Sequence, residues 1–191
     1  MPTAQADPGD HETGHVPETE RALDLTVSLG AGFENFVSSA LREVAGTGPS
    51  WNVRAAVGST GAVRVEVTYA GSAQPLTAAA GHLMAHGLNG VLRVNFAPWA
   101  AVEPFVYLGA GWNRFHVRGM RPANIEAVDH VLELPLGLGV AYRHSRVMVD
   151  IRAGLTVASG ADLLPTTDPN ASPSGEAMHR FALRANIGID L

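Results

Sequence analysis

The 191-residue chain contains no cysteine and no lysine, and only 16% of its residues are charged. The absence of cysteine excludes a disulfide scaffold and a Cys-ligated metal site. The net charge of −5 disfavours a nucleic-acid-binding protein, which would carry a basic stripe. All 13 basic residues are arginine, the residue type that pairs bidentately with carboxylates and stays charged when it loses water.

A long hydrophobic run is also missing. The longest weakly polar stretch, Leu76 to Val91, is interrupted by glycines and contains His82 and His86. A membrane-spanning helix needs about 20 mostly apolar residues. The sequence therefore predicts no transmembrane helix, which leaves the closed β-barrel as the other structure that can cross a bilayer.

The first 21 residues differ in composition from the rest of the chain. They are polar, acidic and contain proline and glycine, which predicts a flexible tail. Ala4-Gln5-Ala6 has the A-x-A form that precedes signal cleavage, so the tail is interpreted either as carrying a signal-peptide remnant or as a plain polar tail. His11 and His15 fit the H-E-x-x-H zinc pattern by letter, but Gly14 between them disfavours the helix that such a site needs.

From residue 22 onward, apolar and polar residues alternate with a period of two. Sustained alternation predicts strands with one apolar and one polar face. In seven segments no charged residue falls on the apolar face, and an eighth, 103–113, is assigned by analogy with its neighbours. The eight predicted strands are 23–33, 51–58, 63–70, 88–96, 103–113, 132–143, 147–157 and 181–191.

The connections between these segments alternate between short and long. Short ones are expected at 59–61, 97–100 and 144–146. Long ones are expected at 34–50, 71–87, 114–130 and 159–179, with a short helical turn within 74–86. Alternating connections of this kind are typical of membrane barrels, which have tight periplasmic turns and longer outer loops. The sequence predicts an all-β protein, with an eight-stranded antiparallel up-and-down transmembrane β-barrel over 22–191.

Aromatic residues lie near the two ends of the apolar faces. Membrane barrels carry such residues as two girdles at the bilayer interfaces. The predicted membrane-interface aromatics are Phe33, Trp51, Tyr69, Trp112 and Phe181 near the outer ends, and Phe96, Trp99 and Tyr142 near the inner ends.

A repeated Leu-Gly-x-Gly element occurs at 29–32, 108–111 and 136–139, and 104–112 reads Pro-Phe-Val-Tyr-Leu-Gly-Ala-Gly-Trp. With these elements and its final strand, the chain resembles the small eight-stranded outer-membrane barrels of the OmpA/OmpX type. That family's last strand usually ends in Phe or Trp, whereas this one ends in Leu191. The resemblance implies a bacterial outer-membrane protein that contacts outer-membrane lipid and lipopolysaccharide. It also implies a monomer, inserted by the barrel assembly machinery.

In a barrel of this type the polar faces turn inward. An eight-stranded interior is only wide enough for side chains to fill it, so the charges there are expected to pair and to plug the lumen. A gated ion path of low conductance is the alternative. The predicted network contains Arg54, Arg64, Arg93, Arg143, Arg152 and Arg184 with Asp24, Glu66, Glu103, Glu133, Asp150 and Asp190.

Two other functions fit parts of the sequence. A soluble lipocalin-like barrel would bind a small lipophilic ligand on an inward apolar face, but the Gly-x-Trp element near the first strand is missing. A lipid A-modifying enzyme would use outer-loop histidines, but His86-Gly87-Leu88-Asn89 lacks the serine nucleophile. We expect no enzyme activity, no cofactor and no nucleic-acid partner, and a structural or surface-interaction role through the outer loops. The histidines considered are His82, His86, His116, His130 and His179.

Overall fold

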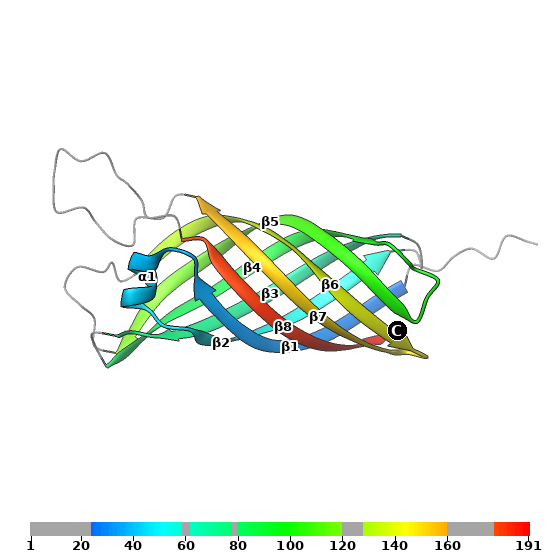
Figure 1. The fold of residues 1–191 in the computed structure, drawn as a ribbon, viewed down its shortest axis with the longest axis horizontal. Coiled ribbons are helices and arrows are strands. Elements are labelled where there is room, and N and C mark those ends of the chain that lie inside the picture. The colour runs from blue at the N-terminus through cyan, green and yellow to red at the C-terminus, as the bar shows by residue number, and fades with distance from the viewer. Residues whose placement is uncertain (1–23, 59–61, 78–79, 120–127, 160–177) are drawn as a thin grey trace, which may run out of the picture.

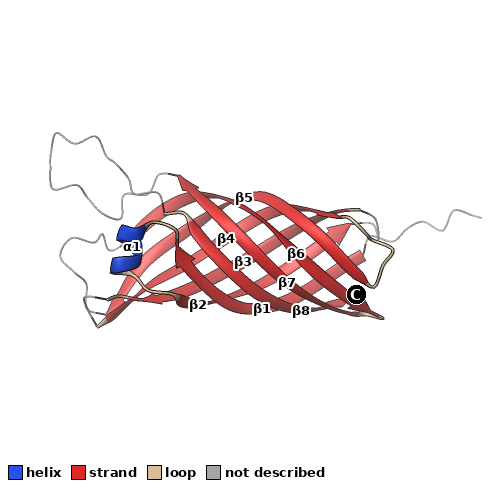
Figure 2. Ribbon diagram, in the orientation of Figure 1, coloured by secondary structure: helices blue, strands red, loops and turns tan. Residues whose placement is uncertain are grey.

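The computed structural model describes residues 24–58, 62–77, 80–119, 128–159 and 178–191. It is built from strands, with one short helix (Figures 1 and 2). The elements are β1 (Asp24–Phe36), α1 (Ser39–Val44), β2 (Gly48–Gly58), β3 (Val63–Pro75), β4 (Gly81–Asn95), β5 (Val102–Gly119), β6 (Val128–His144), β7 (Val147–Ser159) and β8 (Arg180–Asp190). No helix in the described part of the chain is long and apolar enough to span a membrane. The tail at 1–21 lies outside the described residues.

Each strand pairs antiparallel with its neighbours in sequence, and β8 pairs with β1 to close the barrel. The closing ladder runs from Thr26 opposite Asp190 to Phe36 opposite Arg180. Closure leaves no strand with an unpaired edge. The structure confirms the predicted all-β, eight-stranded antiparallel up-and-down barrel.

The two ends of the barrel differ (Figure 1). One end carries α1 and the connections β1–β2, β3–β4, β5–β6 and β7–β8, and is called the loop end here. The opposite end carries the other connections and the C-terminus, and is called the turn end. There the β6–β7 hairpin turns through Ser145, whose φ of 54° lies in the left-handed region.

Two expectations about the connections are wrong. The predicted long loop at 71–87 is mostly sheet, because the β3–β4 ladder continues from Gly71 opposite His86 to Pro75 opposite His82. The described residues within 74–86 form no helical turn, since the backbone groups of 74–75 and 82–83 bond across the hairpin. The helix lies instead in the β1–β2 connection, where the Ser38 side chain accepts a hydrogen bond from the Leu41 N–H and caps it.

The apolar face of every strand points outward and the polar face points inward. Leu108 and Leu132 on the outside are 61% and 67% exposed, whereas Arg93 and Glu66 on the inside are each 1% exposed. Burial alternates residue by residue along the strands, as the sequence predicts. A lipocalin-like barrel has the opposite arrangement, so the structure argues against that alternative.

At the loop end the polarity of the two strand faces is reversed. There the inward side chains are apolar and form a buried cluster, which we call the apolar cap, while outward positions of β4 and β5 carry polar residues such as His82 and Arg118. Strands β4 and β5 therefore extend beyond the outward apolar band. The cap consists of Phe36, Leu41, Ala45, Leu76, Leu83, Ala85, Phe115, Val131, Ala158 and Met178.

Candidate functional site

The lumen holds two groups of charged side chains, one toward each end of the barrel. The group nearer the turn end, called the turn-end cluster, is drawn from β2 to β8. It contains Arg54, Glu66, Arg93, Glu103, Arg143, Asp150, Arg152 and Asp190. The structure thus brings together eight of the residues predicted from the alternation.

Arg152 is the central cation of the turn-end cluster. Its guanidinium donates to both carboxylate oxygens of Glu66 at 2.6 and 2.9 Å, and its Nε donates to Asp150 at 2.9 Å. Asp150 also accepts from Arg54 at 2.6 Å and from the Asn186 amide at 2.7 Å. The buried carboxylates of Glu66 and Asp150 are tolerated because arginine or amide donors reach their oxygens.

Arg93 is held differently. Its guanidinium carbon lies 3.7 Å from the centroid of the Phe105 ring, and its Nε donates to Asn95 at 2.6 Å. Its nitrogens approach Glu103 and Glu66 only to 3.6 and 3.7 Å. Stacking on an aromatic face, rather than a tight ion pair, therefore dominates the contacts of Arg93.

At the rim of the turn end, the charges reach partial exposure. Arg143 donates to Asp190 and, at 3.3 Å, to Glu103. Asp190 also accepts from the Thr26 hydroxyl at 2.6 Å, which links β8 to β1. Arg64 is buried in the lumen as predicted from its face. The side chain of Asp24 is outside the described part of the structure.

A second group, the loop-end cluster, lies beneath the apolar cap and consists of Glu34, Glu133, Arg180 and Arg184. Glu34 accepts hydrogen bonds from Arg180 at 2.8 Å and Arg184 at 2.6 Å. Ser72 and Gln74 donate to the same carboxylate at 2.9 and 3.3 Å. Arg180 also pairs with Glu133.

The sequence interpretation missed Glu34 and Arg180. It ended the first strand at residue 33 and began the last at 181, so each residue fell one position outside its strand. The period-two alternation could have found them if it had been continued past the strand ends. Glu34 lies two residues after the inward Gly32, and Arg180 lies two residues before the inward Ala182. The strands continue past the apolar band, where outward hydrophobicity no longer marks them.

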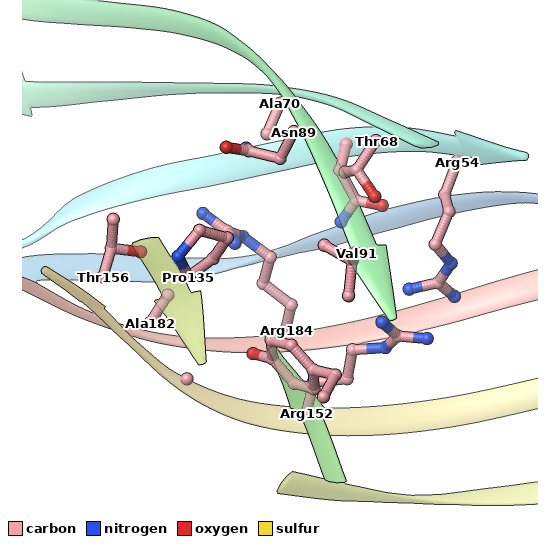
Figure 3. Close-up of a pocket in the computed structure, with 13 residues that line it drawn as sticks. Arg54, Thr68, Ala70, Asn89, Val91, Pro135, Arg152, Thr156, Ala182 and Arg184 are labelled. Carbon is pink, nitrogen blue, oxygen red and sulfur yellow. The ribbon is translucent and has the colours of Figure 1, made fainter. Parts of the chain in front are cut away.

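A cavity of about 60 Å3 separates the two clusters (Figure 3). Arg54 and Arg152 line it from the turn side and Arg184 from the loop side. The buried side-chain oxygens of Asn52 and Asn89, which also line it, accept no hydrogen bond from the protein. A polar space of this size accommodates a few water molecules, which suits these groups.

The lumen is therefore filled along its length. The apolar cap closes the loop end, because its members come from most of the strands and from α1, whose Leu41 is 2% exposed. The two ion-pair clusters fill the space below. Among the described residues, this arrangement forms a polar core that encloses the small central cavity.

The eight predicted interface aromatics all lie on the outside of the barrel, with exposed fractions from 39% at Trp51 to 85% at Trp99. Trp51 packs edge-to-face on Tyr69 with 5.5 Å between ring centroids. It also lies across Gly71, where an added Cβ would come within 2.6 Å of the indole. The full set is Phe33, Trp51, Tyr69, Phe96, Trp99, Trp112, Tyr142 and Phe181.

The histidines considered for catalysis lie near the loop end. His82, His86, His116 and His130 occupy outward positions of β4, β5 and β6. His179 lies just before β8, and its Nδ1 accepts from the Ala158 N–H at 3.2 Å. No group of three His, Cys, Asp or Glu side chains within the described ranges could hold a metal ion.

Comparison with known proteins gives likeness in fold alone. No family model matches the chain, and neither does any curated protein. Among solved structures, a major outer membrane protein of Thermus thermophilus is similar, with a TM-score of 0.59 and 16% identity, covering 89% of this chain and 100% of that one. Neisserial surface protein A has a TM-score of 0.55 and 12% identity, covering 88% and 97% of the two chains.

The outer membrane enzyme PagL is also similar, with a TM-score of 0.50 and 14% identity, covering 86% of this chain and 98% of that one. The same barrel architecture thus serves an enzyme as well as other outer-membrane proteins. The fold therefore defines the architectural class, the small outer-membrane type of eight-stranded barrel. It does not decide between activities.

Proposed function

We propose that the chain is an integral outer-membrane β-barrel protein with a plugged lumen. The observation that carries this proposal is the orientation of the two faces: Leu29 and Ile187 are each 60% exposed on the outside, while Arg93 and Asp150 are 1% exposed inside. In water such an exterior would be an aggregation-prone patch around the whole barrel. In a bilayer the same band contacts lipid and every strand has its backbone paired, which satisfies the main constraint on membrane proteins.

The likeness to solved outer-membrane barrels supports the bacterial outer membrane as the location. Outer-membrane lipid and lipopolysaccharide are then the surrounding partners, and the barrel assembly machinery is the partner during insertion. The single closed barrel is consistent with a monomer. No nucleic-acid partner is proposed, given the net charge of −5.

For the role in the membrane, we propose structural support and surface interaction through the loops at the loop end, without enzyme activity. The filled lumen favours this role over transport, because the apolar cap and two ion-pair clusters obstruct a water-filled path. A narrow pore of low conductance is the second candidate. The central cavity of about 60 Å3 is the only observation that favours it.

The proposal is tested by refolding the protein into detergent micelles and comparing heated with unheated samples on an SDS gel. A closed membrane barrel resists SDS until it is heated, so we expect a mobility shift and protease resistance in the unheated band. The control is protein refolded without detergent. If that protein remains soluble and monodisperse and shows the same protection, the membrane proposal is wrong.

A further inference from the structure

Basic side chains gather on the outward face of β4, β5 and β6, immediately beyond the apolar band at the loop end. They alternate with inward residues such as Leu83 and Phe115 of the apolar cap, so they point away from the lumen. We call this surface the outer basic patch. It consists of His82, His86, Arg114, His116, Arg118 and His130.

Strand pairing places these residues side by side. On β4 and β5, His82 is opposite Arg118 and His86 is opposite Arg114. Arg114 is in turn opposite His130 on β6. Residues paired in this way have Cβ atoms about 4.5–5.5 Å apart, so three strands contribute to one continuous surface.

Ring stacking holds part of the patch in a fixed arrangement. The His86 and His116 rings stack with centroids 5.4 Å apart and an interplanar angle of 19°. The His130 ring stacks in the same way on Trp112, at 5.3 Å and 18°. These contacts join the patch to the predicted aromatic girdle and reduce the side-chain freedom that a bound group would have to restrict.

A groove of about 600 Å3 runs along the patch. Its lining changes from apolar to basic in the direction of the loop end: Leu88 and Trp112 belong to the apolar band, and Arg114 follows two residues further along β5. A lipid changes in the same order along its length, from an apolar acyl chain to a charged headgroup. The groove is lined by Tyr69, His86, Gly87, Leu88, Trp112, Arg114, His116 and Val117.

Arg114 and Arg118 carry the permanent positive charge of this surface. Within the described residues, the outward positions of β3, β4, β5 and β6 carry no carboxylate. This contrasts with the lumen, where the arginines are paired with Asp and Glu. A surface that holds two arginines, with no outward carboxylate on the described parts of these strands, is complementary to an anion from outside the protein.

We propose that the outer basic patch binds the anionic phosphate headgroup of a membrane lipid, with the acyl chain lying along Leu88 and Trp112. Arg114 supplies a planar, permanently charged fork that suits phosphate oxygens. The His86 and His116 rings each have an N–H donor in either protonation state. This inference rests on the proposed function, since it places the loop-end edge of the apolar band at the level of the headgroups.

Tryptophan fluorescence tests the proposal in lipid vesicles. The Trp99→Phe substitution first removes the tryptophan at the turn end. The fluorescence then comes only from Trp51 and Trp112, which lie beside the patch. The protein is reconstituted into phosphatidylcholine vesicles that contain either brominated phosphatidylglycerol or brominated phosphatidylcholine at equal mole fraction. Bromine quenches only nearby tryptophan, so the ratio of the two quenching curves gives the relative affinity for an anionic phosphate headgroup over a zwitterionic one.

We expect brominated phosphatidylglycerol to be preferred by roughly fivefold or more, the order of effect of one or two basic residues at a membrane surface. The preference should fall to near unity in the His86→Gln/Arg114→Gln double variant. The matched control, Arg146→Gln, removes an exposed arginine at the opposite end of the barrel and should leave the preference unchanged. Each variant is first checked for the heat-dependent gel shift, so that a misfolded protein is not counted.

The outcomes separate the two proposals. If both brominated lipids quench equally in the Trp99→Phe protein, the barrel is in the bilayer and only the headgroup site is wrong. If neither lipid quenches, the protein is not in the bilayer, and the proposed function and the headgroup site both fail. If millimolar inorganic phosphate abolishes the preference, the patch is a site for free anions and the lipid proposal is wrong.

Discussion

Arg152 and Glu66 form a bidentate ion pair across the lumen, in which two guanidinium nitrogens donate to the two carboxylate oxygens at 2.6 and 2.9 Å. Arg152 comes from β7 and Glu66 from β3, four strands apart around the closed barrel. The pair therefore joins opposite walls. It serves the purpose that an apolar core serves in a soluble barrel.

Replacing Arg152 should destabilise the barrel more than any other single arginine substitution in the turn-end cluster. In Arg152→Ala, Glu66 loses its closest cation and Asp150 loses one of its two close cations, while both carboxylates remain buried. Breaking a buried pair in this way costs about 3–5 kcal/mol in the free energy of unfolding. Urea unfolding in detergent micelles measures the loss. Arg146→Ala, at an exposed turn, is the control and should change stability by less than about 0.5 kcal/mol; equal losses in the two variants would contradict the assignment.

Arg93→Ala should cost less than Arg152→Ala, about 1–3 kcal/mol. Its principal contacts are the Phe105 ring and the Asn95 side chain, and the carboxylates near it keep Arg152 and Arg143 as partners. Arg93→Lys keeps the charge but loses the planar stacking, so it should recover only part of the loss. The same urea titration ranks these variants. Full recovery by lysine would show that charge, not stacking, is what matters at this position.

Salt should weaken the ion pair at the rim but not the one in the lumen. The side chains of Arg143 and Asp190 are 20% and 21% exposed, whereas those of Arg152 and Glu66 are 9% and 1% exposed. Screening acts mainly on exposed charges. A double-mutant cycle for each pair, measured at about 0.05 M and 1 M NaCl, should show a smaller coupling energy at high salt only for Arg143–Asp190. Parallel salt dependence of the two cycles would mean that water reaches the lumen pair.

Gly139→Ala should destabilise the barrel by about 1–3 kcal/mol. An added Cβ would lie 2.4 Å from the Phe105 ring and 2.5 Å from the carbonyl oxygen of Ile151, and Phe105 is buried beneath Arg93. Gly90→Ala is a matched control on the outer face, where the added Cβ meets only the Ala110 carbonyl oxygen at 3.9 Å. It should be neutral or slightly stabilising. Thermal unfolding of both variants in micelles makes the comparison, which fails if Gly90→Ala loses as much as Gly139→Ala.

Planar-bilayer recordings of the refolded protein should show no regular conductance steps. Removing part of the apolar cap with Phe115→Ala should not open a path, because Arg180 and Glu34 still cross the lumen below it. Steps that appear only in Phe115→Ala would identify the cap as a gate. Steps in the unmodified protein would favour the narrow-pore alternative.

The fold could be predicted from the sequence because one physical rule governs most of it. In a barrel wall, neighbouring residues face opposite environments, and no charged residue interrupted the apolar faces of seven predicted strands. The even strand number and the up-and-down order followed from that pattern. The strand ends could not be predicted, since β4 and β5 continue beyond the apolar band and their faces reverse in polarity there.

The sequence predicted which residues belong to the candidate site but not which of them pair with each other. Alternation identified Arg54, Glu66 and Arg152 as inward residues, yet it could not show which arginine meets which carboxylate across the lumen. Barrel closure determines the pairing, because it brings residues from strands far apart in sequence to the same level along the barrel axis. Arg93 illustrates the point: alternation identified it as an inward residue, whereas its place beside Phe105 depends on the β4–β5 register.

The closing seam between β1 and β8 has a consequence for the order of biosynthetic events. Thr26 donates to Asp190, a partner 164 residues later in the chain, and the whole β1 ladder on that side needs β8. A nascent chain that lacks β8 leaves a row of unpaired β1 backbone groups, which a lipid interior does not tolerate. Translation must therefore pass residue 190 before the barrel can be completed. Until then β1 has no partner on that side, so closure of the barrel is necessarily a late event in the synthesis of the chain.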